Sequence, residues 1–188
     1  MRIVGGAFGG RRLASVGRGD AKAALRPTTD RLRESLFNVL EGGRYGDPVA
    51  DAHVLDLFAG TGALGLEALS RGAATCTFVE NGRAALSILR QNIGLCAVTV
   101  RANVVAQDAR MLTRAPEHPA RLVFLDPPYG RGLGALALTK ARTTGWISRG
   151  ALVLWEEEAP QSAPDGFALR EVRRYGSTSF TFLEVLAL

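Results

Sequence analysis

The chain has 188 residues, a net charge of +5, and 47% hydrophobic against 22% charged side chains. This length suits one compact domain, and the composition excludes a disordered chain. No apolar stretch reaches the roughly 18 residues of a membrane-spanning helix, and no secretory signal is evident, so we expect a cytoplasmic protein without membrane contact. An arginine-rich start also fits an organelle transit peptide, but its glycines disfavour the amphipathic helix of such a peptide.

The excess positive charge lies entirely in residues 1–27. Six basic side chains oppose a single acid there, and the rest of the chain is balanced. Short apolar pieces at Ile3-Val4 and Leu13 predict a small β-hairpin in this arm, which we interpret as an appendage to a single domain over 28–188. A basic segment suits a phosphate polyanion because each neutralised phosphate releases counterions; a solvated tail is the alternative.

Beyond the arm, hydrophobic spacing predicts alternating helices and strands. A capped amphipathic helix starts near Thr29 and stops at Gly42-Gly43. Strands are expected at His53–Phe58, Thr75–Val79, Val98–Ala106, Arg121–Asp126 and Ala151–Trp155, with helices at Ala63–Ser70, Arg83–Ile93, near Met111 and within Leu133–Thr143. This alternation predicts an α/β fold with a parallel sheet covered on both faces. The consecutive runs Phe167–Tyr175 and Thr178–Leu186 predict an antiparallel hairpin at one edge.

The first predicted strand leads into a glycine loop, Ala59-Gly60-Thr61-Gly62-Ala63-Leu64-Gly65, and Glu80 ends the next strand. This spacing matches GxGxxG with its ribose-binding acid. Glycines let a ligand approach the backbone, and the helix that follows offers free N–H groups at its amino terminus. We therefore expect a nucleoside cofactor; a turn of small residues that serves only packing is the alternative.

Asp56, just before the loop, favours S-adenosylmethionine over NAD. Its carboxylate can accept hydrogen bonds from the ammonium of an amino-acid moiety, and a bond to the loop backbone is an alternative that can coexist. Asp108, near the end of the third strand, is placed to accept from the adenine amino group or to cap a helix. The expected cofactor contacts are Asp56, Ala59, Gly60, Thr61, Gly62, Glu80, Asp108 and Ala109.

The tetrapeptide Asp126-Pro127-Pro128-Tyr129 follows the fourth predicted strand, at the sheet edge where open parallel sheets place their chemistry. It resembles the motif of the amino-methyltransferases, which methylate nucleobase amines with S-adenosylmethionine. Such an amine shares its lone pair with the ring until acceptors hold it, and Asp126 and the Pro127 carbonyl can supply them. Tyr129 can stack on an extruded base. A strand-ending turn is the alternative.

Three segments are similar to the bacterial RsmD family: the early Gly-Gly-Arg-Arg-Leu and residues 26–38 and 56–72. The resemblance implies a Rossmann-like class I methyltransferase fold with seven strands. It also implies methylation of the 2-amino group of one guanine in 16S ribosomal RNA, within the small ribosomal subunit. The expected RNA contacts are Arg11, Arg12, Arg26 and Arg31. Asn81 departs from the family, which often has an acid after the ribose-binding Glu80.

Three other functions stay open. A DNA adenine or cytosine amino-methyltransferase shares both motifs but normally carries a target-recognition insert, for which this chain is short. An NAD oxidoreductase would need a hydride-transfer constellation that does not stand out, and an RNA-binding module without catalysis would have no use for Asp126 or Tyr129. Cys76, Cys96 and the two histidines lack metal-ligand spacing, so we expect buried thiols and no metal.

Overall fold

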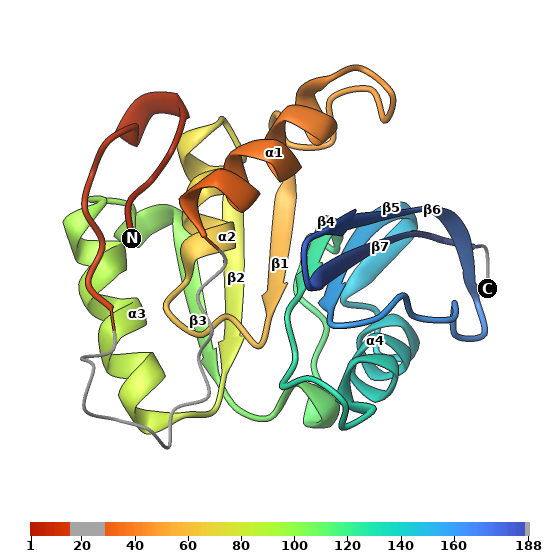
Figure 1. The fold of residues 1–188 in the computed structure, drawn as a ribbon. Helices are drawn as coiled ribbons and strands as arrows, with labels where there is room; N and C mark the ends of the chain where they lie inside the picture. Colours follow the sequence, from red (N-terminus) through yellow and green to blue (C-terminus); the bar gives the residue numbers. More distant parts are fainter. Residues whose placement is uncertain (16–28, 187–188) are drawn as a thin grey trace.

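A seven-stranded sheet forms the centre of the computed structural model, which describes residues 1–15 and 29–186 (Figure 1). Its order is β3-β2-β1-β4-β5-β7-β6. Strands β1 to β5 run parallel, and β7 is antiparallel to both β5 and β6, which confirms the predicted sheet and its closing hairpin. The strands are β1 His53–Leu57, β2 Thr75–Glu80, β3 Ala102–Ala106, β4 Ala120–Leu125, β5 Ile147–Glu157, β6 Phe167–Tyr175 and β7 Thr178–Val185.

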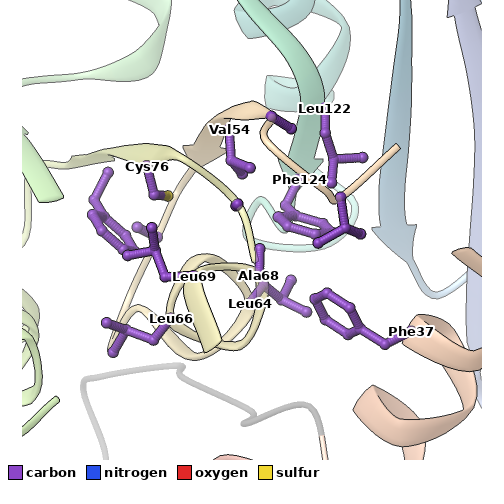
Figure 2. Packing of buried hydrophobic residues seen from close by; sticks show 14 of the residues in the cluster. Phe37, Val54, Leu64, Leu66, Ala68, Leu69, Cys76, Leu122 and Phe124 are labelled. Atoms are coloured by element: carbon purple, nitrogen blue, oxygen red, sulfur yellow. The ribbon is translucent and has the colours of Figure 1, made fainter. Parts of the chain in front are cut away.

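Helices cover both faces of this sheet. They are α1 Asp30–Glu41, α2 Ala63–Ser70, α3 Arg83–Leu95 and α4 Leu133–Thr143, with 3-10 turns η1 Gly6–Phe8, η2 Thr99–Arg101 and η3 Ala109–Met111. Because strand side chains alternate between faces, Val54 packs toward α1, α2 and α3, whereas Leu55 packs toward η3 and α4. Figure 2 shows Phe37 reaching from α1 toward Phe124 of β4, and the ring centroids lie 5.7 Å apart.

Residues 1–15 fold back on themselves and dock on α2. Backbone bonds join Ile3 to Arg11 and Leu13 to Met1, and both Ile3 and Leu13 are buried in the core. Glu67 of α2 accepts hydrogen bonds from the Val4 and Gly5 amides, each at 2.8 Å. The described part of the arm therefore forms a hairpin-like loop with one isolated bridge, Arg2 to Arg12, instead of a regular two-stranded ladder.

Two strands begin four residues away from their predicted starts. The segment expected to pair from Val98 forms η2 first and joins the sheet only at Ala102, because Ala97 turns through a positive φ of 55° and Val98 is buried directly after α3. Strand β5 starts earlier than expected, at Ile147, since residues 148–150 are Ser, Arg and Gly and interrupt the apolar pattern. Both cysteines are buried free thiols, as predicted. No helix within the described ranges is long and apolar enough to cross a membrane.

Candidate active site

The glycine loop turns sharply between β1 and α2. Gly60 and Gly62 have positive φ values of 56° and 81°, a region that side chains with a Cβ rarely adopt. The Gly62 amide donates to the Ala59 carbonyl at 2.7 Å, and a Cβ built on Gly62 would lie 2.4 Å from Cδ1 of Leu89. Conformation and packing thus both require glycine at position 62, which brings the loop backbone close to α3.

Glu80, at the end of β2, is fixed by three backbone amides. Its Oε2 accepts from Gly60 at 2.9 Å, and its Oε1 accepts from Asn81 at 2.9 Å and from Gly82 at 2.6 Å. The carboxylate therefore ties the glycine loop to the turn before α3. Asn81 contributes through its backbone, so its departure from the family pattern leaves this contact unchanged.

Asp56 is 2% exposed near the end of β1, and its Oδ2 accepts from the Gly65 amide at 3.0 Å. The pKa of Asp56 is raised to about 8, because burial and the nearby Glu80 carboxylate together outweigh the lowering effect of the Gly65 bond, and burial is the largest cause. The backbone contact foreseen for Asp56 is present. Within residues 1–15 and 29–186, Asp56 forms no ion pair that would balance its charge.

The segment Asp126–Tyr129 continues from β4 directly beside the glycine loop. The Asp126 amide donates to the Leu57 carbonyl at 3.3 Å, so the pairing of β1 with β4 extends into the motif. The pKa of Asp126 is raised well above its ordinary value, first by burial and then by the carboxylates of Glu156, Asp56 and Glu157. Three acidic strand ends therefore converge on one edge of the sheet.

Glu156 and Glu157, at the end of β5, were missed by the sequence reasoning. Both side chains are buried, and Glu156 Oε1 accepts from the Tyr129 hydroxyl at 3.0 Å. Burial and Glu156 raise the pKa of Tyr129, so its hydroxyl stays a donor. The available signal was an acidic pair at the carboxyl end of a predicted parallel strand, where such sheets place their sites. The resulting acidic surroundings favour a group that gains positive charge.

Asp108 caps η3, which was the alternative interpretation of this residue. Its Oδ1 accepts from the Arg110 amide at 2.9 Å, and the Arg110 guanidinium lowers the pKa of Asp108. The following Ala109 is buried in the second core cluster. A contact of Asp108 or Ala109 with adenine stays a prediction.

Three of the four candidate RNA-binding arginines lie on the amino-terminal hairpin or on α1. Arg11, Arg12 and Arg31 are exposed, whereas Arg26 lies outside the described residues. Arg11 also has a local role, because its Nη1 donates to the Leu95 carbonyl at 2.9 Å and its guanidinium lies 5.5 Å from the Phe8 ring centroid.

Asn92 of α3 is a second residue that the sequence reasoning missed. It is fully buried, and its Nδ2 donates to the Thr61 carbonyl of the glycine loop at 2.9 Å and to the Ala14 carbonyl at 3.1 Å. Its Oδ1 accepts from the Ala14 amide at 2.7 Å. The side chain therefore joins the hairpin to the glycine loop.

The strand order, the antiparallel end of the sheet and the glycine loop after β1 define a class I methyltransferase fold. The solved structure of yhhF from Escherichia coli superposes with a TM-score of 0.83 and 36% identity, covering 100% of this chain and 99% of that one. The chain belongs to the RsmD family: the family model described as Conserved hypothetical protein 95 matches residues 1–184. The resemblance noted in the sequence is thereby confirmed.

Several curated relatives carry the name Ribosomal RNA small subunit methyltransferase D, among them proteins of Escherichia coli and Haemophilus influenzae. The Escherichia coli K12 protein is 40% identical over 164 residues, which are 87% of this chain and 78% of that protein. The Haemophilus influenzae protein is 32% identical over 185 residues, which are 96% of this chain and 91% of that protein. The similarity therefore spans nearly the whole chain.

Proposed function

We propose that this protein transfers a methyl group from S-adenosylmethionine to the exocyclic 2-amino group of a guanine in small-subunit ribosomal RNA. The observation that carries the proposal is the position of Asp126–Tyr129 directly after β4, adjacent to the glycine loop that Glu80 holds. The names of the curated relatives support the ribosomal RNA and the small subunit. The choice of guanine and of its 2-amino group rests on the family resemblance, and the cytoplasm is the expected place of the reaction.

The chemistry of this edge fits S-adenosylmethionine, which supplies an electrophilic methyl group when bound. Glu80 is oriented by three amides and can accept from ribose hydroxyls with its remaining lone pairs. Asp56 is buried with a pKa of about 8, and an ammonium group beside it would offset the cost of its charge. Because Gly60 and Gly62 have no side chains, the cofactor could approach the loop backbone closely. We assign the cofactor contacts to Asp56, Ala59, Gly60, Thr61, Gly62, Glu80, Asp108 and Ala109.

The Asp126 motif would hold the accepting amine. The amine would gain positive charge on accepting the methyl group, for which the cofactor's neutral thioether would be the leaving group. Asp126 and the Pro127 carbonyl accept from this amine and stabilise the charge it gains, an effect strongest in the transition state. The nitrogen then loses its proton to Asp126 or to water. Tyr129, whose hydroxyl donates to Glu156, would stack on the extruded base, and Pro128 would fix the turn.

Transfer of tritiated methyl from S-adenosylmethionine to naked ribosomal RNA, whole small subunits and duplex DNA tests this proposal. We expect label in the RNA or the subunit, located on a guanine 2-amino group by nucleoside analysis. Label in duplex DNA, or none in any RNA, would contradict the proposed function.

Asp126→Ala should lower single-turnover methylation by about two orders of magnitude or more while cofactor still binds, because the interaction it removes matters chiefly to the transition state. Rapid-quench kinetics with saturating RNA measures the rate, and calorimetry with the cofactor provides the control. Turnover should also rise with pH as Asp126 ionises, since the pKa of this carboxyl is raised. A wild-type rate in the variant would remove Asp126 from the mechanism.

A further inference from the structure

A hollow of about 730 Å³ lies at the opposite end of the parallel strands from the acidic site. It is lined by His53 at the start of β1, by Arg121 near the start of β4 and by Arg149 of β5. The loop after α1, including Arg44, completes one wall, and Figure 1 shows this loop at the end of the sheet where β1 begins. Arg121 and Asp126 are five residues apart along the direction of β4. At roughly 3.3 Å per strand residue, this separation is about 17 Å.

Positive charge dominates the lining of this hollow. Its four arginines, Arg44, Arg121, Arg149 and Arg170, are all exposed, and its two carboxylates are Asp47 and Glu184. We call these four residues and the hollow between them the arginine pocket. Arg170 pairs with Glu184 at 3.3 Å, and Arg44 pairs with Glu171 at 3.1 Å. Within the ranges that the structure describes, Arg121 and Arg149 form no ion pair, so two guanidinium groups remain for a ligand.

Two histidines far apart in the sequence meet at the same place. The rings of His53 and His118 stack with centroids 4.8 Å apart and an interplanar angle of 13°. His53 Nδ1 lies 2.7 Å from Thr75 Oγ1, which fixes the orientation of that ring. The pair adds ring nitrogens to the polar lining of the pocket.

The tyrosine ring in the lining is already packed, as are the two stacked histidine rings. Tyr45 stacks on Phe182 with centroids 5.6 Å apart, and its hydroxyl donates to Glu171 at 2.6 Å. A nucleobase would need an open aromatic face or a set of edge-reading groups. Exposed guanidinium groups instead match the geometry of phosphate oxygens, to which arginine donates two parallel hydrogen bonds.

We propose that the arginine pocket binds backbone phosphates of the RNA substrate, away from the nucleotide that is methylated. This inference rests on the proposed function, because it takes RNA as the substrate. Phosphate contacts fix the position of a nucleic acid without reading its sequence. The pocket would thus orient the RNA across the molecule, and one RNA must extend past the target nucleotide to occupy both ends of the sheet.

The test compares Arg121→Gln/Arg149→Gln with Arg90→Gln/Arg114→Gln, which removes the same charge from exposed arginines that do not line the pocket. Dissociation constants for naked small-subunit ribosomal RNA are measured over a series of KCl concentrations. For the pocket variant we expect affinity to fall by about tenfold and the slope of log K against log salt to become shallower by about 0.7 to 0.9 for each phosphate that the variant no longer binds. The control should stay near wild type, and both variants should bind cofactor normally in calorimetry.

Three outcomes would overturn the proposal. The first is a pocket variant with wild-type affinity and salt slope, and the second is an equal reduction of affinity in the control, which would indicate a general charge effect. In the third, inorganic tripolyphosphate binds the wild type but not the pocket variant while RNA binding is unchanged, which would indicate a site for a small phosphorylated ligand. A wild-type protein that methylates no RNA refutes the proposed function instead, so the two failures are distinguishable.

Discussion

Asp56 is a carboxyl group whose surroundings oppose its charge. An aspartate in an unfolded chain titrates near 4, roughly, whereas burial raises the pKa of Asp56 to about 8 in the folded protein. Between these pH values the folded state holds a proton that the unfolded state has released. The free energy of unfolding therefore falls as pH rises through this window. This loss of stability arises because the buried carboxyl is suited to a bound cation and is unfavourable when ionised alone.

Asp56→Asn should accordingly gain stability relative to wild type as pH increases from about 5 to about 8, because the neutral amide can still accept from Gly65 without bearing a charge. Urea denaturation at several pH values measures this gain. A constant difference between variant and wild type across the window would mean that Asp56 does not titrate there.

The same variant should bind S-adenosylmethionine about tenfold or more weakly, since it cannot form a charge-assisted hydrogen bond to the ammonium group. Wild-type binding should release a proton near neutral pH, because the bound cation favours ionised Asp56. Calorimetry in two buffers of different ionisation enthalpy detects that proton. Equal proton release by Asp56→Asn would assign the titration to another group.

Tyr129 combines an aromatic ring with a hydroxyl that donates to Glu156 at 3.0 Å. Tyr129→Phe keeps the ring and should retain most of the RNA-dependent rate, whereas Tyr129→Ala removes the stacking surface and should lower base capture, for which stacking contributes about 1–3 kcal/mol. Steady-state kinetics on small-subunit RNA compares the two. Equal reductions would mean that the hydroxyl, and not the ring, is the important part.

At the scale of elements, α2 anchors the amino-terminal hairpin through one buried carboxylate. Glu67 is fully buried, accepts from the Val4 and Gly5 amides, and pairs with Arg71 at 2.8 Å. Arg71 extends the network to Glu41 of α1, also at 2.8 Å. The hairpin, α1 and α2 are therefore held by a single set of polar contacts that water does not reach at Glu67.

Glu67→Ala should lower the free energy of unfolding by about 3–5 kcal/mol, because it removes the acceptor of the Val4 and Gly5 amides and a carboxylate 4.0 Å from the fully buried guanidinium of Arg33. Glu67→Gln, which has a side chain of similar shape and keeps one acceptor oxygen, should lower the free energy of unfolding by less. Denaturant titration gives the ranking, and limited proteolysis reports on release of the hairpin. An alanine variant as stable as wild type would show that Glu67 does not hold the network.

Elements whose local sequence signals agree with their tertiary surroundings could be predicted from the sequence alone. The glycine loop, Glu80 and the Asp126 motif were placed on the correct strand ends because spacing and strand alternation together determine which edge they share. Glu156 and Asn92 were missed because their partners, Tyr129 and Ala14, are distant in the chain. Local periodicity contains no information about such contacts.

Across the whole molecule, acidic and basic side chains gather at opposite ends of the parallel strands. Buried carboxylates gather where the parallel strands end, while the arginine pocket lies where they begin. The basic hairpin adds a further positive surface on α2. We infer that RNA approaches through basic surfaces and that only the target base enters the acidic edge, where a phosphate would be repelled.

Arg12→Ala should therefore lower the affinity for cognate and non-cognate RNA by similar factors. The slope of log K against log salt should become shallower by about 0.7 to 0.9, as expected for the loss of one phosphate contact. Arg12 is preferable to Arg11 for this purpose, because Arg11 also binds the Leu95 carbonyl and packs on Phe8. Fluorescence anisotropy over a salt series measures the slope. An unchanged slope would exclude Arg12 from the RNA interface.

The central pairing of β1 with β4 also constrains the order in which the chain can fold. Val54 pairs with Leu122, and two helices and two further strands lie between them in the sequence. Such long-range pairing slows folding, because the chain loses the entropy of loop closure before the stabilising contacts between the two strands form. The hairpin is synthesised first, yet its partners Glu67 and Asn92 emerge from the ribosome much later. During translation, the amino-terminal hairpin of this protein would therefore stay undocked until α3 has been made.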